Sequence, residues 1–176
     1  SEISSLYEKE GKSLPTVFEG KVAKIFRILG YDVEELGQGK GNNPDGVAVA
    51  EEDNHIIIYD AKAREEGYDI GTDDRKFKDY IETQQNKHKG KNNIFFLIIC
   101  SEYVGNKAII KEKVKDILMT TRAKDIIVLE ASLLLYLLEL KLRYPSDVTP
   151  YLLQRFFIGK TGIISKEQID EELRPR

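Results

Sequence analysis

Residues 47–62 contain two short apolar runs separated by a polar tetrad, and this arrangement constrains the fold more than any other part of the chain. Val47 and Val49 alternate with small residues, residues 51–54 are polar, and residues 55–59 are rich in β-branched side chains. Alternation with a period of two, interrupted by a polar turn, is typical of a β-hairpin. We therefore expect two antiparallel strands over residues 47–62.

Acidic and basic residues stand at one end of this hairpin. The second strand ends in Asp60-Ala61-Lys62, and Asp45 stands at the entry to the first strand. Side chains along a strand point to opposite faces in turn, so Asp60 and Lys62 share a face. The hairpin pairing brings Asp45 opposite the end of the second strand. The sequence thus predicts two carboxylates and one ammonium close together.

This trio favours one kind of chemistry. Two neighbouring carboxylates repel each other unless a cation lies between them, and hard oxygen ligands prefer Mg²⁺ or Mn²⁺. A divalent ion polarises a phosphate oxygen and lowers the pKa of a bound water, while a nearby ammonium positions that water or neutralises charge. The trio predicts metal-assisted phosphodiester hydrolysis. The alternative is an ordinary Pro-Asp-Gly turn beside a solvated Asp-x-Lys pair.

The order Pro44-Asp45 and then Asp60-Ala61-Lys62 resembles the PD-(D/E)xK nuclease motif. The surrounding sequence resembles the cleavage domain of FokI-type restriction endonucleases, with further matches in residues 66–68, 79–82, 158–162 and 165–168. This resemblance implies an α/β fold with a mixed central β-sheet flanked by helices, the restriction-endonuclease-like core. It also implies Mg²⁺-dependent DNA cleavage, with Mn²⁺ able to substitute, in which Asp45, Asp60 and the Ala61 carbonyl bind metal and Lys62 orients the attacking water.

Glu19 is a further candidate through the same resemblance, because an acidic residue on the helix before the core can enter the metal site in this superfamily. Apolar residues at helical spacing predict a helix over residues 16–29. Thr16 and Glu19 also fit a capping box, in which Glu19 would only accept from the Thr16 backbone N–H. We favour the role in the metal site, and the capping alternative remains open.

Arg75 and Asp79 lie on the predicted helix that follows the active site. In FokI-like domains this helix helps to form a homodimer, through an acidic and a basic residue one turn apart that pair across the two-fold axis. Here the signs are exchanged, and an i, i+4 pair stays self-complementary when two copies run antiparallel. The resemblance implies a transient homodimer for double-strand cleavage. An intrahelical surface pair is the alternative.

Length and composition fit one nuclease domain over residues 1–176. The chain is 41% hydrophobic and 32% charged, and no apolar run is long enough to cross a membrane. No signal-peptide pattern is present, and the one cysteine, Cys100, ends an apolar strand at residues 94–100, so we expect a buried thiol. These features indicate a cytoplasmic protein, which the resemblance places in a prokaryote.

The net charge of −3 is unexpected for a protein that binds double-stranded DNA. A weak positive field predicts weak nonspecific attraction to the polyanion. That fits a cleavage module brought to DNA by a separate DNA-recognition domain, as in type IIS enzymes. We therefore expect the chain to be a fragment of a longer enzyme.

Strands alternating with helices predict the rest of the fold. We expect strands at residues 31–36, 94–100 and 125–129, and helices at 74–87, 107–119, 131–143 and 150–157, with a last helix beginning near Ser165. The leucine-rich helix at 131–143 reads as core, with an interface to another domain as the alternative.

Two other functions share these features. A repair or recombination nuclease of the same superfamily, such as a junction resolvase, would have the same core and would prefer branched or nicked DNA. A nuclease-like module used only for binding is the second alternative. The retained Asp45, Asp60 and Lys62 argue against it, because an inactive site has no physical reason to keep repelling carboxylates together.

Overall fold

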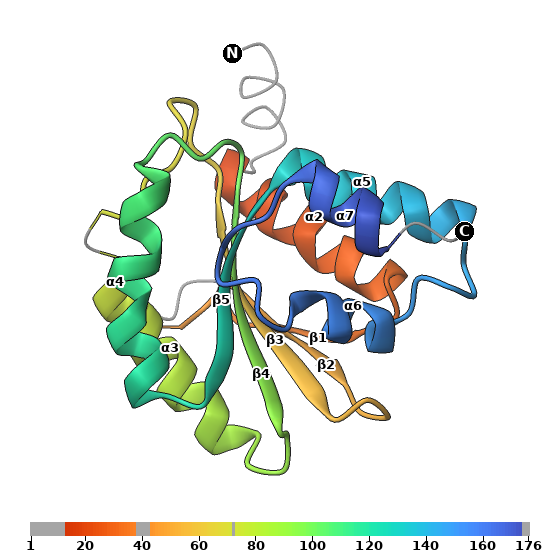
Figure 1. Ribbon diagram of the computed structural model, residues 1–176, viewed down its shortest axis with the longest axis horizontal. Coiled ribbons are helices and arrows are strands. Elements are labelled where there is room, and N and C mark those ends of the chain that lie inside the picture. The colour runs from red at the N-terminus through yellow and green to blue at the C-terminus, as the bar shows by residue number, and fades with distance from the viewer. Residues whose placement is uncertain (1–12, 38–42, 72, 174–176) are drawn as a thin grey trace.

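The computed structural model describes residues 13–37, 43–71 and 73–173, which form an α/β fold around a six-stranded sheet (Figure 1). The strands follow chain order across the sheet. Strands β1 to β3 pair antiparallel and β3 to β6 pair parallel, so the sheet is mixed, as expected. Their bounds are β1 Asp32–Glu35, β2 Gly46–Ala50, β3 His55–Lys62, β4 Asn93–Cys100, β5 Ala123–Glu130 and β6 Gly162–Ile163.

Helices cover both faces of the sheet (Figure 1). One face carries α2 (Leu14–Ile28), α5 (Ala131–Arg143), α6 (Pro150–Phe157) and α7 (Lys166–Glu172), and the other carries α3 (Asp74–Lys87) and α4 (Lys107–Thr120). No helix among the described residues is long and apolar enough to cross a membrane.

Strands β3 and β4 separate two apolar cores. Ile57 and Phe95 face the helices on the side of α2, whereas Ile56 and Phe96 face those on the side of α3. Because both faces are covered, these central strands read as continuous apolar runs. Cys100 is fully buried at the end of β4, as expected, and burial raises the pKa of its thiol to about 12.

The predicted hairpin is confirmed, with Val47 opposite Ile58 and a turn in which Asn54 has a positive φ of 53°. The largest difference from the expected helix bounds is at the start of α2. Ser13, not Thr16, is the N-cap, and its hydroxyl accepts a hydrogen bond from the Thr16 amide at 3.4 Å. Helix α2 therefore begins two residues earlier than predicted, because Ser and Thr are both good N-cap residues and only one can be used.

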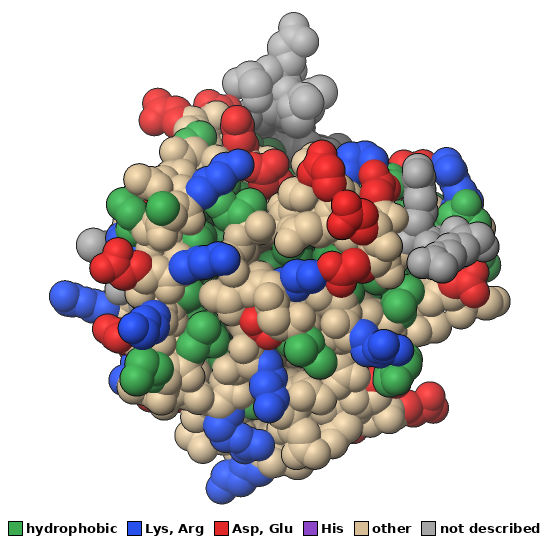
Figure 2. All heavy atoms as spheres, viewed as in Figure 1, with side chains coloured by type: hydrophobic (Ala, Val, Ile, Leu, Met, Phe, Trp, Pro, Cys, Tyr) green, Lys and Arg blue, Asp and Glu red, His purple; other side chains and the backbone are tan. Residues whose placement is uncertain are grey.

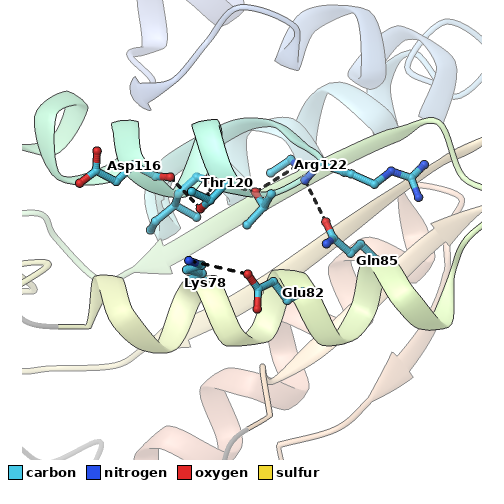
Figure 3. A network of polar contacts seen from close by, with 9 residues as sticks. Lys78, Glu82, Gln85, Asp116, Thr120 and Arg122 are labelled. Carbon is cyan, nitrogen blue, oxygen red and sulfur yellow. Dashed lines mark hydrogen bonds and ion pairs between the residues drawn. The ribbon is translucent and has the colours of Figure 1, made fainter.

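Helices α3 and α4 lie side by side and are joined by polar contacts (Figure 3). The Gln85 side chain of α3 accepts a hydrogen bond from the Arg122 amide at 2.8 Å. On the surface of α3, Lys78 and Glu82 form an i, i+4 ion pair at 3.8 Å. The Gln85 contact joins α3 to the turn between α4 and β5, whereas the Lys78–Glu82 pair lies within α3.

Strand β6 was not predicted, because it is only two residues long. The buried Asp125 carboxylate accepts hydrogen bonds from the Gly159 and Thr161 amides and from the Thr161 hydroxyl, at 2.9, 3.1 and 2.8 Å. A carboxylate that satisfies several donors fixes a loop more firmly than apolar contact does. Asp125 thereby directs the chain into β6.

Candidate active site

Asp45 lies against the end of β3, as the hairpin register predicts. Its amide donates a hydrogen bond to the Tyr59 carbonyl at 3.1 Å, and its carboxylate Oδ2 accepts one from the Ala61 amide at 2.6 Å. The Asp45 side chain is thereby fixed beside Ala61, which lies between Asp60 and Lys62 in β3. These contacts place Asp45 at the strand end where the other candidates lie.

Asp60 and Lys62 share one face of β3. Lys62 Nζ lies 2.6 Å from Asp60 Oδ2, and the two side chains are 23% and 3% exposed. Apart from this ion pair, no described group hydrogen-bonds to the buried Asp60 Oδ2. A buried carboxylate that is held by one ammonium alone keeps unsatisfied acceptor capacity, and burying it in this way is costly.

Glu19 reaches the same place from α2. A Cβ atom added to Gly37 would lie 2.7 Å from Asp45 Oδ1 and 3.3 Å from Glu19 Oε2, so both carboxylates lie beside the Gly37 backbone. Since Ser13 caps α2, Thr16 is not the N-cap, and the capping-box alternative for Glu19 is wrong. The rest of the glycine-rich approach, residues 38–42, lies outside the described residues.

The three carboxylates influence one another's protonation. Burial raises the pKa of Asp60 to about 6, and the charge of Asp45 acts in the same direction. Burial also raises the pKa of Asp45, where Glu19 adds to the effect and the Ala61 hydrogen bond opposes it. The pKa of Glu19 is raised by burial and then by Asp60. The site therefore holds negative charge that the protein alone stabilises incompletely.

Lys62 responds in the opposite way. Burial lowers the pKa of its ammonium, but the adjacent Asp60 carboxylate outweighs burial, so the pKa is raised overall. Lys62 is thus charged at neutral pH. A charged lysine can donate hydrogen bonds and neutralise anions, but it cannot accept a proton.

The donor set fits a hard cation. Among the described residues, no three acidic, histidine or cysteine side chains are close enough, as they stand, to hold a metal ion. The carboxylates of Glu19, Asp45 and Asp60 nevertheless all have raised pKa values, and Lys62 is the one described group that pairs with Asp60 Oδ2. Oxygen ligands with uncompensated charge are those that Mg²⁺ and Mn²⁺ prefer.

Three residues near the site were not singled out from the sequence. The Tyr68 hydroxyl donates a hydrogen bond to Asp73 Oδ2 at 3.2 Å, and the charge of Asp73 acts on Lys62. Tyr80 of α3 is buried, and its pKa is raised by burial and then by Asp60. In the sequence, Tyr68 and Tyr80 are indicated only by their place in segments 66–68 and 79–82, which resemble FokI-type cleavage domains. No motif indicates Asp73.

A hollow of about 350 Å³ opens beside the end of β3. Its walls come from the start of α2, from the segment after β3 and from the end of β4, and include Phe18, Ala63, Arg64 and Ser101. Ligands of α/β proteins bind outside the carboxyl ends of the strands, where this hollow lies. Neither Asp60 nor Lys62 is among the residues that line it.

Arg75 and Asp79 are both exposed on α3 and do not join this cluster. Among the side chains that the structure describes, neither forms an ion pair, whereas Lys78 and Glu82 on the same helix pair with each other (Figure 3). The intrahelical Arg75–Asp79 pair is therefore not formed, and both charges remain accessible.

The family model described as "FokI, cleavage domain" matches residues 3–161. A structure of restriction endonuclease FokI superposes with a TM-score of 0.65 at 24% identity, and one of FokI bound to DNA with 0.62 at 20%; each match covers 85% of this chain. The chain spans 28% of the length of those FokI chains. No curated protein sequence matches.

Proposed function

The chain belongs to the FokI cleavage-domain family, and from that premise we propose that it is the Mg²⁺-dependent DNA-cleaving domain of a type IIS restriction endonuclease. The observation that carries the proposal is the convergence of Glu19, Asp45 and Asp60 around a charged Lys62 at one strand end. Packing alone gives no reason to bury repelling carboxylates in this way.

Asp45, Asp60, the Ala61 carbonyl and Glu19 would hold the ion, which is Mg²⁺ or, in its place, Mn²⁺. A bound divalent ion supplies positive charge for a phosphate oxygen and lowers the pKa of a water. The hydrogen bond from the Ala61 amide fixes Asp45 in position, and the buried environment of Asp60 limits its rotation. The protein's own part is thus to pre-organise the oxygen ligands.

Lys62 orients the attacking water and stabilises charge on the phosphate. Its raised pKa favours these two roles over that of general base, because an ammonium has no lone pair to accept a proton. The ion pair with Asp60 holds Nζ at the site before substrate arrives. Negative charge that develops on phosphate oxygens is then close to a fixed cation.

Double-stranded DNA is the proposed substrate, and a separate DNA-recognition domain is the proposed source of sequence specificity. The net charge of −3 supports this division of labour, since the domain has little positive field with which to gather DNA. One such site cuts one strand, so a transient homodimer is needed to break a duplex. Arg75 and Asp79 are exposed on α3 and form no ion pair with another described side chain, so they are suited to pair reciprocally in that dimer.

Cleavage of supercoiled plasmid tests the proposal. The chain at high concentration is incubated in Mg²⁺, in Mn²⁺ or in EDTA, and binding of Mg²⁺ is followed separately by calorimetry. We expect nicked and then linear plasmid in both metals and intact plasmid in EDTA. Equal cutting in EDTA would contradict the metal requirement, and absence of both cutting and metal binding would favour a binding module.

A further inference from the structure

Three lysines of α4, Lys107, Lys111 and Lys115, form one row along the helix, which we call the lysine row. They are four residues apart, so they share one side of α4 and span about 12 Å at the helical rise. All three are exposed, and none forms an ion pair with a described side chain. In the view of Figure 2, Lys and Arg side chains spread over α4, which lies at the left in Figure 1. The row is a strip of accessible positive charge on a chain whose net charge is −3.

The lysine row does not help the helix to fold. Like charges four residues apart repel each other across one turn. Lys107 is also the first residue of α4, whose first turn contains no acidic residue, and a cation at this end opposes the helix dipole. Glu112 and Asp116 follow on the same helix, but among the described side chains neither forms an ion pair with the row. Local stability gives no reason for this arrangement, whereas an anionic partner does.

Other lysines near the row already have partners within the protein. Lys113, on another side of α4, donates a hydrogen bond to the Gly71 carbonyl. Beyond α3, Lys87 and Lys91 each form an ion pair with a glutamate. These three ammonium groups would have to give up a partner to bind a phosphate. The lysine row can bind one without that loss.

The lysine row begins at the end of the sheet that carries the candidate active site. Strand β4 runs parallel to β3, so the helix that follows β4 starts near the end of β3. The Ser101 amide donates a hydrogen bond to the Lys62 carbonyl at 3.3 Å, which joins the segment leading into α4 to the strand of Asp60. From there the row extends along α4 toward the other end of the sheet.

The lysine row also lies on the side of α4 that faces away from α3. Helix α3 packs over β3 and α4 packs over β5 and β6, so α3 and β6 are on opposite sides of α4. A Cβ atom built on Gly162 of β6 would lie 3.3 Å from Lys111 Cε, so the stem of this lysine lies over β6. A homodimer formed through Arg75 and Asp79 of α3 would therefore leave the row accessible.

We propose that the lysine row binds the phosphate backbone of the DNA duplex beside the cleaved bond. One DNA strand carries a phosphate about every 3.4 Å along the helix axis, so a row of about 12 Å spans about three phosphates. Lysine ammonium groups bind phosphate oxygens as point charges, and contacts of this kind carry no sequence information. The inference rests on the proposed function, which makes double-stranded DNA the substrate, and it adds the surface that holds the duplex.

Binding of a short DNA duplex tests the lysine row without cleavage. The chain is titrated into a fluorescent duplex in EDTA, and anisotropy gives the binding constant between about 50 and 200 mM salt. Each phosphate contact adds about 0.9 to the steepness of log K against log salt. The combined variant Lys107→Gln, Lys111→Gln and Lys115→Gln should therefore lose about 2.7 of that slope. The loss should be the same for duplexes of different sequence.

The matched control removes the same charge elsewhere. Lys21→Gln, Lys24→Gln and Lys89→Gln together replace three exposed lysines outside α4 and should leave the slope unchanged. The thermal midpoint of the row variant should stay the same or rise, because repulsion within α4 is removed. Absence of binding by the wild type, or equal slopes in the two glutamine variants, would overturn the proposal.

Plasmid cleavage separates this inference from the proposed function. If the wild type binds the duplex with the steeper slope but does not cut plasmid in Mg²⁺, the proposed function fails and the lysine row remains a DNA-binding surface. If the wild type cuts plasmid while the row variant keeps the full salt dependence, the lysine row is excluded and the proposed function stands.

Discussion

The Ala61 amide donates a hydrogen bond to Asp45 Oδ2 at 2.6 Å. This bond joins the residue just before β2 to the end of β3, where Ala61 lies between Asp60 and Lys62. The register of the hairpin therefore determines the composition of the site. A slip by one residue would turn Asp60 and Lys62 to the other face, away from the carboxylate of Asp45.

Asp60→Asn should stabilise the metal-free protein. The pKa of Asp60 is raised from 3.8 to about 6, so the folded protein favours the protonated carboxyl group. The contribution of this group to the free energy of unfolding is full below pH 3.8 and is lost as the pH rises through 6. An uncharged amide avoids that loss, and we expect a gain on the order of 2 kcal/mol at pH 7.5. Urea unfolding in EDTA measures it, with Asp32→Asn on the exposed face of β1 as control. A loss of stability, or a gain that persists at pH 3, would contradict this explanation.

Acid should destabilise the protein through His55. This buried imidazole lies 3.1 Å from the Tyr31 hydroxyl, and burial lowers its pKa to about 4. The contribution of the neutral imidazole to the free energy of unfolding is full above pH 6.5, and about 3 kcal/mol of it is lost as the pH falls toward 4. The slope of unfolding free energy against pH should therefore be smaller in His55→Gln than in the wild type. Identical slopes in wild type and His55→Gln would refute this role.

Gly37→Ala should impair the site with little effect on the fold. The added methyl group would meet Asp45 Oδ1 at 2.7 Å and displace the carboxylate. We expect at least a tenfold loss of cleavage, because a displacement of about 1 Å at a reacting group can cost 10²-fold. Gly20→Ala on α2 meets nothing within 4 Å and should keep full activity. Comparable activities in the two variants would show that the position of Asp45 is unimportant.

Charge exchange on α3 tests dimerisation. Asp79→Arg alone and Arg75→Asp alone each place like charges across the two-fold axis, so each should slow double-strand cleavage. Mixing the two variants restores opposite charges and should restore cleavage. The dependence of the linearisation rate on enzyme concentration measures the effect, with Asp116→Arg on α4 as control. Second-order dependence that is unchanged in Asp79→Arg would exclude this interface.

The sequence predicted the positions of Asp45, Asp60 and Lys62 better than those of their surroundings, for a physical reason. Strand alternation and a turn specify where Asp45, Asp60 and Lys62 lie, because these depend on local pairing. The start of α2 was missed because Ser13 and Thr16 compete as N-caps. Strand β6 was missed because it depends on Asp125, whose hydrogen-bond partners are more than thirty residues away.

Exposure of α5 could not be predicted for a related reason. A helix with leucines on most sides is usually buried, yet Leu135 and Leu142 are 57% and 68% exposed. Which side of such a helix is covered depends on the packing of α2 and the sheet, and no local pattern encodes that packing. Asp73 is a similar case, since no local motif indicates that its charge acts on Lys62 or that Tyr68 donates a hydrogen bond to it.

The most direct test of the central claim compares the rates at which wild type, Asp60→Asn and Asp116→Asn convert supercoiled plasmid in saturating Mg²⁺. Asp60 lies in the carboxylate cluster, whereas Asp116 is exposed on α4 (Figure 3). Both substitutions remove one negative charge, so the comparison separates an effect of the candidate site from an effect of the net charge. We expect cleavage to be lost in Asp60→Asn, with its fold intact, and to be unchanged in Asp116→Asn. Retained cleavage in Asp60→Asn would show that this carboxylate is not needed for cleavage.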